Sequence, residues 1–372
     1  MSNQTNRNFG LDFVRVVAIG LVLMGHFGHE NFSVLGFWGV ELFFGLSGFL
    51  IGKILWRNFS ESNNWNFKKV SNFWSRRWWR TLPNYYLFFF LILMFDFFSK
   101  DNLIPPLSEL LKYFWFGQYL LSHHLTYYSV SWSLCIEEWF YLTFPLSLLL
   151  LSKLKLSPKT SFSIAIIAFY VIPFLIKLWL IKAGQIDSVR EITLARLDAI
   201  CSGVLITFLT SITTISVKNK LYLFLTGLVL ILLPVFFVLI NKLPSTEILN
   251  NIVFLTTVPL GFSMCLPFIS DFKTAGKIPS FISKSITSLS LYSYSIYLSH
   301  IPVMFITYGY LSNIRQSSSL GNLFSKLLAL GITIIISSFI YRFFEVPLTA
   351  KRPREVKDQI PTGSTSATGL NK

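Results

Sequence analysis

Ten apolar runs, each long enough to cross a bilayer, are distributed along nearly the whole chain. A transmembrane helix needs about 20 consecutive apolar residues. The runs are 11–29, 36–55, 82–98, 132–151, 161–181, 190–210, 221–240, 251–269, 288–311 and 323–345. Only 13% of the residues are charged, against about 25% in a soluble protein. The sequence therefore predicts an all-α integral membrane protein with ten transmembrane helices.

A further apolar segment, 107–122, is short, and we interpret it as re-entrant or interfacial. With the N-terminus in the cytoplasm, the inner segments hold 22 of the 32 Lys and Arg residues and the outer loops hold six. This bias follows the positive-inside rule and predicts cytoplasmic termini in a bacterial inner membrane. We assign the net charge of +15 to this topology and to anionic lipid, not to nucleic acid.

Two regions follow from this pattern: a transmembrane domain over 1–347 and a polar, disordered cytoplasmic tail over 348–372. The start of the chain lacks the features of a cleavable signal peptide. The three cysteines have no metal-ligand spacing, so we expect neither a disulfide nor a zinc site, and no metal elsewhere.

Arg15 and His26 lie within the first apolar run. Eleven helical steps of about 100° bring both to one face of a helix, about 16 Å apart along its axis. Ionisable side chains inside a membrane are costly and are functional by default. His26 is a possible general base, although a structural imidazole bonded to a carbonyl is the alternative.

Two adjacent carboxylates, Glu137 and Glu138, begin the outer end of the fourth run. They point about 100° apart on a helix, so one at most faces the same interior as His26. We choose Glu137 to orient the imidazole and interpret Glu138 as a surface residue. Ser47 precedes Gly48 in mid-span, where close helix packing is a simpler interpretation than a nucleophile.

Three arginines, Arg76, Arg77 and Arg80, lie in a segment, 76–83, that we interpret as a cytoplasmic loop before the third span. They fix topology and also form an anion site. Arg196 and Asp198 are two residues apart and face different directions, so each needs a partner on another helix.

His300 and Glu345 are compatible with either a structural role or contact with the site. His123 and His124 have the character of solvated loop residues.

Taken in order, these motifs resemble the acyltransferase 3 family of integral membrane O-acyltransferases. The matching residues are Arg15 with His26; 37–51 around Ser47; Arg76, Arg77, Arg80 and Pro83; Trp132, Ser133, Glu137 and Tyr141; Arg196 with Asp198; Tyr297 with His300; and Glu345 before Pro347. Glu41 stands where the family usually has Asp, and Val346 where it usually has Arg.

The resemblance implies transfer of an acyl group, commonly acetyl, from acyl-CoA to a hydroxyl of a surface or exported carbohydrate or lipid-linked glycan. It implies that Arg15 and His26 are essential. Acyl-CoA is then a co-substrate, with no permanently bound cofactor. Many relatives carry a fused C-terminal esterase-like domain; we interpret this chain as the stand-alone form, which needs another protein for any second step.

The mechanism that we expect places the CoA phosphates on Arg76, Arg77 and Arg80, with Arg15 further along the donor. His26 takes the proton of the acceptor hydroxyl, and Glu137 holds the imidazole. An acyl-enzyme on His26 or a serine fits the sequence equally well. The remaining polar residues, Ser47, Trp132, Ser133, Tyr141, Arg196, Asp198, Tyr297, His300 and Glu345, support the substrate or the structure.

Four other functions are compatible with parts of the sequence. A proton-coupled secondary transporter also has buried ionisable residues, but the sequence lacks paired inverted repeats. An acyltransferase acting on a small lipid or secondary metabolite is a closer alternative. A glycan polymerase or flippase is disfavoured by the short, poorly charged outer loops. A membrane scaffold needs no buried ionisable network.

Overall fold

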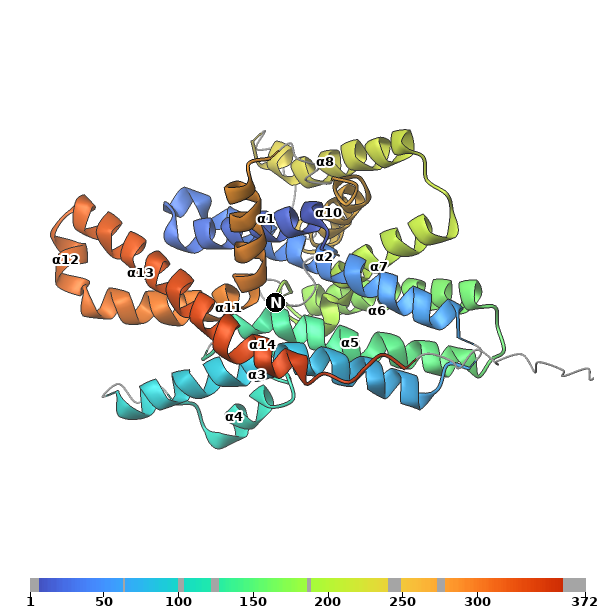
Figure 1. Cartoon of the computed structure of the whole chain (residues 1–372), viewed down its shortest axis with the longest axis horizontal. Helices are drawn as coiled ribbons and strands as arrows, with labels where there is room; N and C mark the ends of the chain where they lie inside the picture. The colour runs from blue at the N-terminus through green and yellow to red at the C-terminus, as the bar shows by residue number, and fades with distance from the viewer. Residues whose placement is uncertain are drawn as a thin grey trace, which may run out of the picture.

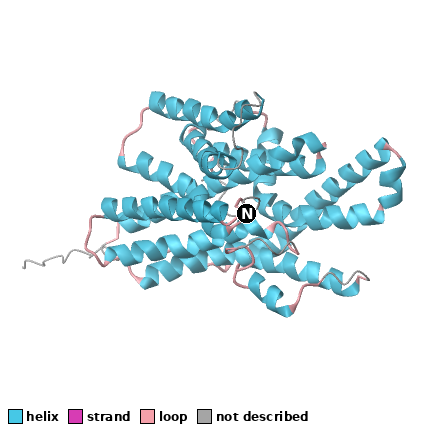
Figure 2. Cartoon of the chain, turned by 180° about the vertical axis from the view of Figure 1, so that it is seen from behind, coloured by secondary structure: helices cyan, strands magenta, loops and turns pink. Residues whose placement is uncertain are grey.

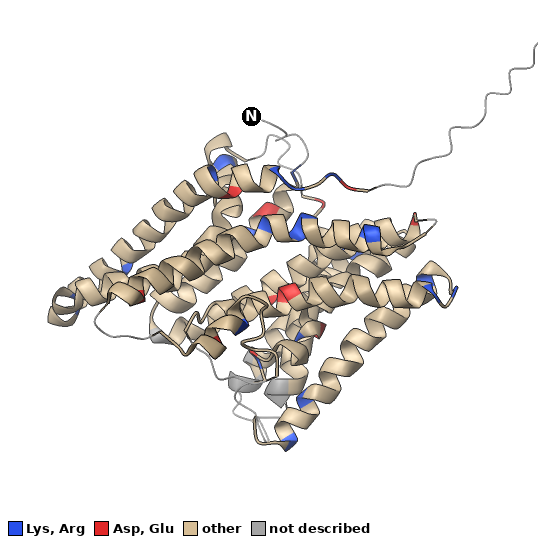
Figure 3. Ribbon diagram, turned by 90° about the horizontal axis from the view of Figure 1, so that it is seen from below, with Lys and Arg blue, Asp and Glu red and all other residues tan. Residues whose placement is uncertain are grey.

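The computed structural model describes residues 7–62, 64–99, 104–121, 127–185, 189–239, 249–272 and 278–356. Within these ranges every regular element is a helix, as Figure 2 shows. Ten helices have the length and hydropathy to cross a membrane. The predicted fold class and the number of spans are therefore confirmed. Most of the helical ribbon carries no charge (Figure 3).

The elements follow one another in a simple order (Figure 1). The long helices are α1 (Phe9–Phe27), α2 (Ser33–Ser60), α3 (Phe67–Phe98), α5 (Ser131–Ser152), α6 (Pro158–Lys182), α7 (Leu197–Ile212), α8 (Val217–Leu239), α10 (Leu255–Ile269), α11 (Ser280–Tyr310) and α13 (Ser319–Ile340). The short ones are η2 (Glu30–Phe32), α4 (Leu107–Tyr113), η4 (Thr193–Ala195), η5 (Leu249–Phe254), α12 (Ser312–Ser317), η6 (Tyr341–Glu345) and α14 (Val346–Ala350).

Helix α2 lies at the centre and packs against α1, α7 and α10. Its contact with α7 depends on glycine. A Cβ on Gly48 would lie 1.9 Å from the carbonyl oxygen of Ile200, and one on Gly203 would lie 2.2 Å from that of Gly45. The backbones touch, as small residues permit in membrane helices. The interpretation of the Ser47–Gly48 pair as a packing site is confirmed for Gly48.

Within the described part of the segment after α3, helix α4 (Leu107–Tyr113) is too short to cross a membrane, in agreement with the interpretation of 107–122 as re-entrant or interfacial. Helix α4 has only seven residues. Tyr85 on α3 donates a hydrogen bond to the carbonyl of Tyr113 at 3.0 Å, and Trp139 on α5 donates to that of Phe116 at 3.0 Å. These bonds hold the segment against α3 and α5. His123 and His124 lie outside the described residues.

Helix α3 corrects one interpretation, because residues 76–83 are helical and not a loop. The helix begins at Phe67, where the side chain of Asn66 caps it by accepting from the amide of Lys69 at 3.2 Å. Pro83 lies inside the helix, which membrane proteins tolerate when neighbours satisfy the freed backbone groups. The apolar pattern missed this start because the first turns are polar.

The chain end forms the short helix α14 and a segment after it, both on the side that we predict to be cytoplasmic. After α14, which packs beside α3, residues 351–356 continue along α3 (Figure 1). Asn72 donates to the carbonyl of Arg354 at 2.9 Å and accepts from the amide of Val356 at 3.2 Å. The first nine residues of the predicted tail are thus helical or bound to α3, and 357–372 lie outside the described residues.

Candidate active site

A cavity of about 120 Å³ lies between α1, α2, α3, α5 and α11. Sites for drug-sized ligands measure roughly 300–1,000 Å³, so this space suits a narrow chain end better than a sugar ring. Its polar lining consists of Arg15, Ser47, Arg77, Arg80, Thr81, Ser133, Glu137, Tyr141, Ser293, Tyr294 and Tyr297. Many of the predicted site residues therefore meet in one place.

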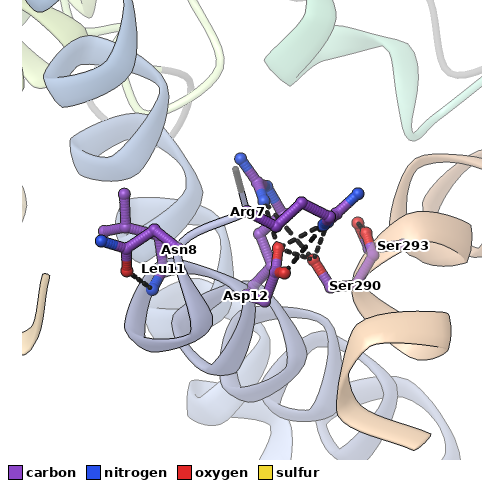
Figure 4. Close-up of polar contacts among 7 residues, drawn as sticks. Arg7, Asn8, Leu11, Asp12, Ser290 and Ser293 are labelled. Carbon is purple, nitrogen blue, oxygen red and sulfur yellow. Dashed lines mark hydrogen bonds and ion pairs between the residues drawn. The ribbon is translucent and has the colours of Figure 1, made fainter. Parts of the chain in front are cut away.

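Arg15 enters the cavity from α1 and is held by Asp12, one turn earlier. The Asp12 carboxylate is buried and accepts from Arg15 at 3.0 Å and from Ser290 on α11 at 2.8 Å. Arg7 adds a bidentate pair to the same carboxylate at 2.9 and 2.5 Å. Figure 4 shows Arg7, Asp12 and Ser290 converging between the two helices. Asp12 thus fixes the guanidinium of Arg15 at the cavity wall.

The three arginines of α3 divide between two environments. Arg77 and Arg80, one turn apart, line the cavity, and Arg77 also stacks 5.5 Å from the ring centre of Tyr141. Arg76 instead donates to the carbonyl of Pro353 at 2.8 Å and does not line the cavity. Two of the three arginines predicted to bind the anion are therefore brought together with Arg15, and Arg76 holds the chain end.

Glu137 and Glu138 lie in the second turn of α5 and contact different neighbours. Glu137 lines the cavity and accepts from the Ser47 hydroxyl at 2.5 Å. Glu138 is not a surface residue, which corrects our interpretation: it is 5% exposed and accepts from Thr81 at 2.7 Å. Thr81 could have been identified as a site residue from the sequence, because it lies four residues after Arg77 and therefore on the same face of a helix.

Ser133 and Tyr297 form a contact between α5 and α11 at the cavity. Their hydroxyl oxygens are 2.6 Å apart across α5 and α11. Both residues line the cavity and both are buried. The adjacent Trp132 packs edge-on against Phe44, with 6.0 Å between ring centres. Of this adjacent pair, Ser133 therefore lines the cavity and Trp132 packs behind it.

His26 lies outside the cavity lining. Its ring centre is 5.1 Å from that of His300, which in turn lies 5.6 Å from that of Tyr297. His300 is fully buried, with Nδ1 2.7 Å from the carbonyl oxygen of Tyr297. Because a carbonyl only accepts, Nδ1 carries the proton. His26 itself is exposed.

The pairing of His26 with Glu137 stays a prediction. Among the described residues, the side-chain hydrogen bond recorded for Glu137 comes from Ser47, and the ring contact of His26 is with His300. The sequence had no signal for the contact between the two histidines, which come from α1 and α11.

Arg196 and Asp198 find their partners on other helices, as predicted. Arg196 forms a fully buried ion pair of 2.5 Å with Glu41 on α2. Asp198 forms one of 2.5 Å with Lys177 on α6 and accepts from Thr256 at 2.7 Å. Neither residue lines the cavity. The sequence analysis did not identify Lys177, whose position in an apolar run was the available signal.

Glu345 joins α3 to α11 beside the cavity. Its Oε2 accepts from Asn84 at 2.8 Å and from Ser295 at 3.0 Å. Asn84 lies one turn beyond Arg80 on α3, and its helical spacing could have identified it. Within the described ranges, no group of three or more His, Cys, Asp or Glu residues is arranged to hold a metal ion.

Comparisons with known proteins agree with this arrangement. The sequence profile of an acyltransferase domain matches residues 8–342. The peptidoglycan O-acetyltransferase OatA of Listeria monocytogenes is 26% identical over 91% of this chain and 55% of its own length. A "Putative O-acetyltransferase" of Staphylococcus aureus is 25% identical over 91% of this chain and 56% of its own.

A shorter match, to the "Putative peptidoglycan O-acetyltransferase YrhL" of Bacillus subtilis, is 34% identical over 37% of this chain and 23% of that protein. This chain thus spans about half the length, or less, of the curated relatives it matches. No solved structure gives a significant match. Because the domain profile covers nearly the whole chain, with Arg15, His26 and the cavity inside the match, the protein belongs to the acyltransferase 3 family of membrane acyltransferases.

Proposed function

We propose that the protein transfers an acyl group, most simply acetyl, from cytoplasmic acyl-CoA to a hydroxyl of a cell-envelope carbohydrate. The cavity carries the proposal: Arg15, Arg77 and Arg80 line it with Glu137 as the one carboxylate. The excess of positive charge suits a donor that bears phosphates. The relatives' printed names supply peptidoglycan as the first acceptor to test.

The proposed topology puts the donor and the acceptor on opposite sides. The excess of Lys and Arg in the inner segments supports cytoplasmic termini in a bacterial inner membrane. The arginines of α3 are then on the cytoplasmic half, and His26 lies toward the outer face. The acyl chain end enters the narrow cavity, whose volume suits it, while the carbohydrate approaches the exposed His26.

The proposed reaction needs one base and one leaving group. His26 removes the proton of the acceptor hydroxyl, and the oxygen forms a bond to the thioester carbonyl carbon. The tetrahedral intermediate collapses as the carbon–sulfur bond breaks, and the CoA thiolate takes up a proton from His26. His300 lies beside His26, and the bond from its Nδ1 to the carbonyl of Tyr297 fixes the orientation of its ring against that of His26.

The proposal is tested with radiolabelled acetyl-CoA fed to inverted membrane vesicles that contain the wild type, His26→Ala or His29→Ala. His29 is the matched control because it is an exposed histidine just beyond α1. We expect base-labile ester on glycan for the wild type and His29→Ala, and none above background for His26→Ala. Full incorporation by His26→Ala contradicts the scheme. No incorporation by the wild type from any acyl-CoA favours a transporter.

A further inference from the structure

Arg190, in the turn that precedes η4, is held by two aromatic rings from different helices. Its guanidinium carbon lies 5.0 Å from the ring centre of Phe37 on α2 and 5.0 Å from that of Trp132 on α5. Cation–π contacts at this distance are attractive, the more so where water is excluded. The sequence analysis counted Arg190 only as a cation of an outer loop, so its fixed position is a finding of the structure.

Part of the hydrogen-bonding capacity of this arginine is unused among the described residues. Its Nε is buried and has no hydrogen-bond partner, and no ion pair in the described ranges includes Arg190. Burial lowers the pKa of Arg190, which Glu41 only partly opposes. The carboxylate of Glu41 is already paired with Arg196. A guanidinium held between two rings, with its buried Nε unpaired within the described ranges, is prepared for an anion.

The location of Arg190 assigns this anion to the acceptor. Phe37, on which Arg190 stacks, follows Gly36, where an added Cβ would lie 4.0 Å from Nε2 of His26, so Arg190 lies on the side of the site that contains His26. It does not line the cavity that contains Arg15, Arg77 and Arg80. Phosphates of the donor therefore have their own arginines, at a different site.

We propose that Arg190 binds an anionic oxygen group, a carboxylate or a phosphate, of the carbohydrate acceptor beside His26, and so selects anionic acceptors. The inference rests on the proposed function and adds the acceptor's charge to it. A planar guanidinium matches carboxylate and phosphate through two parallel hydrogen bonds. The faces of Phe37 and Trp132 fix its orientation, which limits the entropy lost on binding.

The test is steady-state acetyl transfer by the full chain in lipid nanodiscs with three matched tetrasaccharides. One carries free carboxylates, as alternating N-acetylglucosamine and N-acetylmuramic acid. The second is the same compound with its carboxylates converted to methyl amides. The third is the methyl amide with a terminal phosphate. The variants are Arg190→Gln and Arg190→Lys. Arg315→Gln is the control, because Arg315 also stacks on an aromatic ring: its guanidinium carbon lies 4.3 Å from the ring centre of Tyr308.

We expect the wild type to prefer the carboxylate or the phosphate acceptor, and the preferred one identifies the group. Arg190→Gln raises KM for that acceptor about 10- to 100-fold, the effect of one charged hydrogen-bonded contact. The kcat, the KM for acetyl-CoA and the transfer to the neutral acceptor stay unchanged. Arg190→Lys restores part of the affinity, and Arg315→Gln behaves as wild type.

Two results overturn the inference while leaving the proposed function intact. The first is a wild type that acetylates all three acceptors equally well. The second is an Arg190→Gln variant that loses kcat equally on charged and neutral acceptors, which is the behaviour of a group acting on the reaction itself. If the wild type acetylates none of the acceptors, while other acyl-CoA donors and isolated glycan also fail, the proposed function fails first. Comparison of the neutral and charged acceptors needs no variant, so a folding defect does not obscure the result.

Discussion

Ser47 on α2 and Glu137 on α5 are joined across the cavity by a 2.5 Å hydrogen bond, in which the serine hydroxyl donates to Oε1. Arg77 and Arg80 line the same cavity as this carboxylate. The serine proton is engaged in this bond, so Ser47 positions Glu137 among the arginines. This contact combines the close packing of α2 with the polar lining of the site.

We expect Ser47→Ala to lower kcat/KM for acyl transfer about 10- to 100-fold, because a hydrogen bond to a charged group contributes about 1.5–3 kcal/mol. Residual activity separates this positioning role from that of a nucleophile, whose removal would abolish turnover. Ser147→Ala is the control, since Ser147 bonds only to a carbonyl of its own helix. Initial rates in nanodiscs decide between the two, and activity at background level contradicts the prediction.

Asp12→Asn is expected to weaken donor binding. The neutral amide no longer pairs with Arg15, so the guanidinium loses its fixed position at the cavity wall. We expect KM for acetyl-CoA to rise about 10-fold, in the range of one lost charged contact, with KM for the acceptor unchanged. Asp271→Asn is matched to it, because Asp271 pairs with Lys220 at the surface. An equal rise in KM for both substrates would contradict a specific role at the donor site.

His300→Phe is expected to lower kcat without changing KM for the donor. The substitution keeps a ring beside His26 but removes the Nδ1 donor that bonds to Tyr297 and the buried Nε2 that has no partner. About a 10-fold loss corresponds to one altered hydrogen-bonded contact. His29→Phe provides the control. The prediction is wrong if His300→Phe turns over at the wild-type rate, in which case the two histidines only pack.

The sequence predicted the membrane architecture well because apolar length and charge are local properties. The ten spans and the non-crossing segment near α4 were all readable from residue composition. The polar start of α3 was not, since helix there depends on the Asn66 cap and on packing rather than on hydropathy. Helix ends are hardest to predict where a helix begins with polar residues, because the apolar pattern then starts later than the helix.

The contacts within the site were harder to predict from the sequence than the identities of its residues. Helical periodicity placed Arg15 and His26 on one face, and the need of Arg196 and Asp198 for partners followed from their spacing. The identity of those partners, Glu41 and Lys177, depends on how α2, α6 and α7 pack. The burial of Glu138 also depends on helix packing, because predicting it requires the knowledge that Thr81 on α3 faces α5.

The buried pair of Arg196 and Glu41 is expected to stabilise the fold only as a pair. Glu41→Gln leaves a fully buried guanidinium without its counter-charge, which costs about 3–5 kcal/mol of unfolding free energy. The double variant Glu41→Leu, Arg196→Met removes both charges and is expected to be clearly more stable than Glu41→Gln. Denaturant titration in micelles measures both. Glu355→Gln, which breaks an exposed pair with Arg57, is expected to cost at most about 1 kcal/mol.

The attachment of the chain end to α3 gives the last prediction. Asn72 makes two hydrogen bonds to the backbone of 354–356, so Asn72→Ala is expected to release this segment and to expose the bond after Arg354 to trypsin. We expect cleavage to be about 10-fold faster than in wild type, in line with one to two lost hydrogen bonds. Ser71→Ala is the neighbouring control, since Ser71 bonds within its own helix. Cleavage in inverted vesicles but not in intact cells also tests the proposed cytoplasmic position of the end, and equal rates for all three proteins would show that Asn72 does not restrain it.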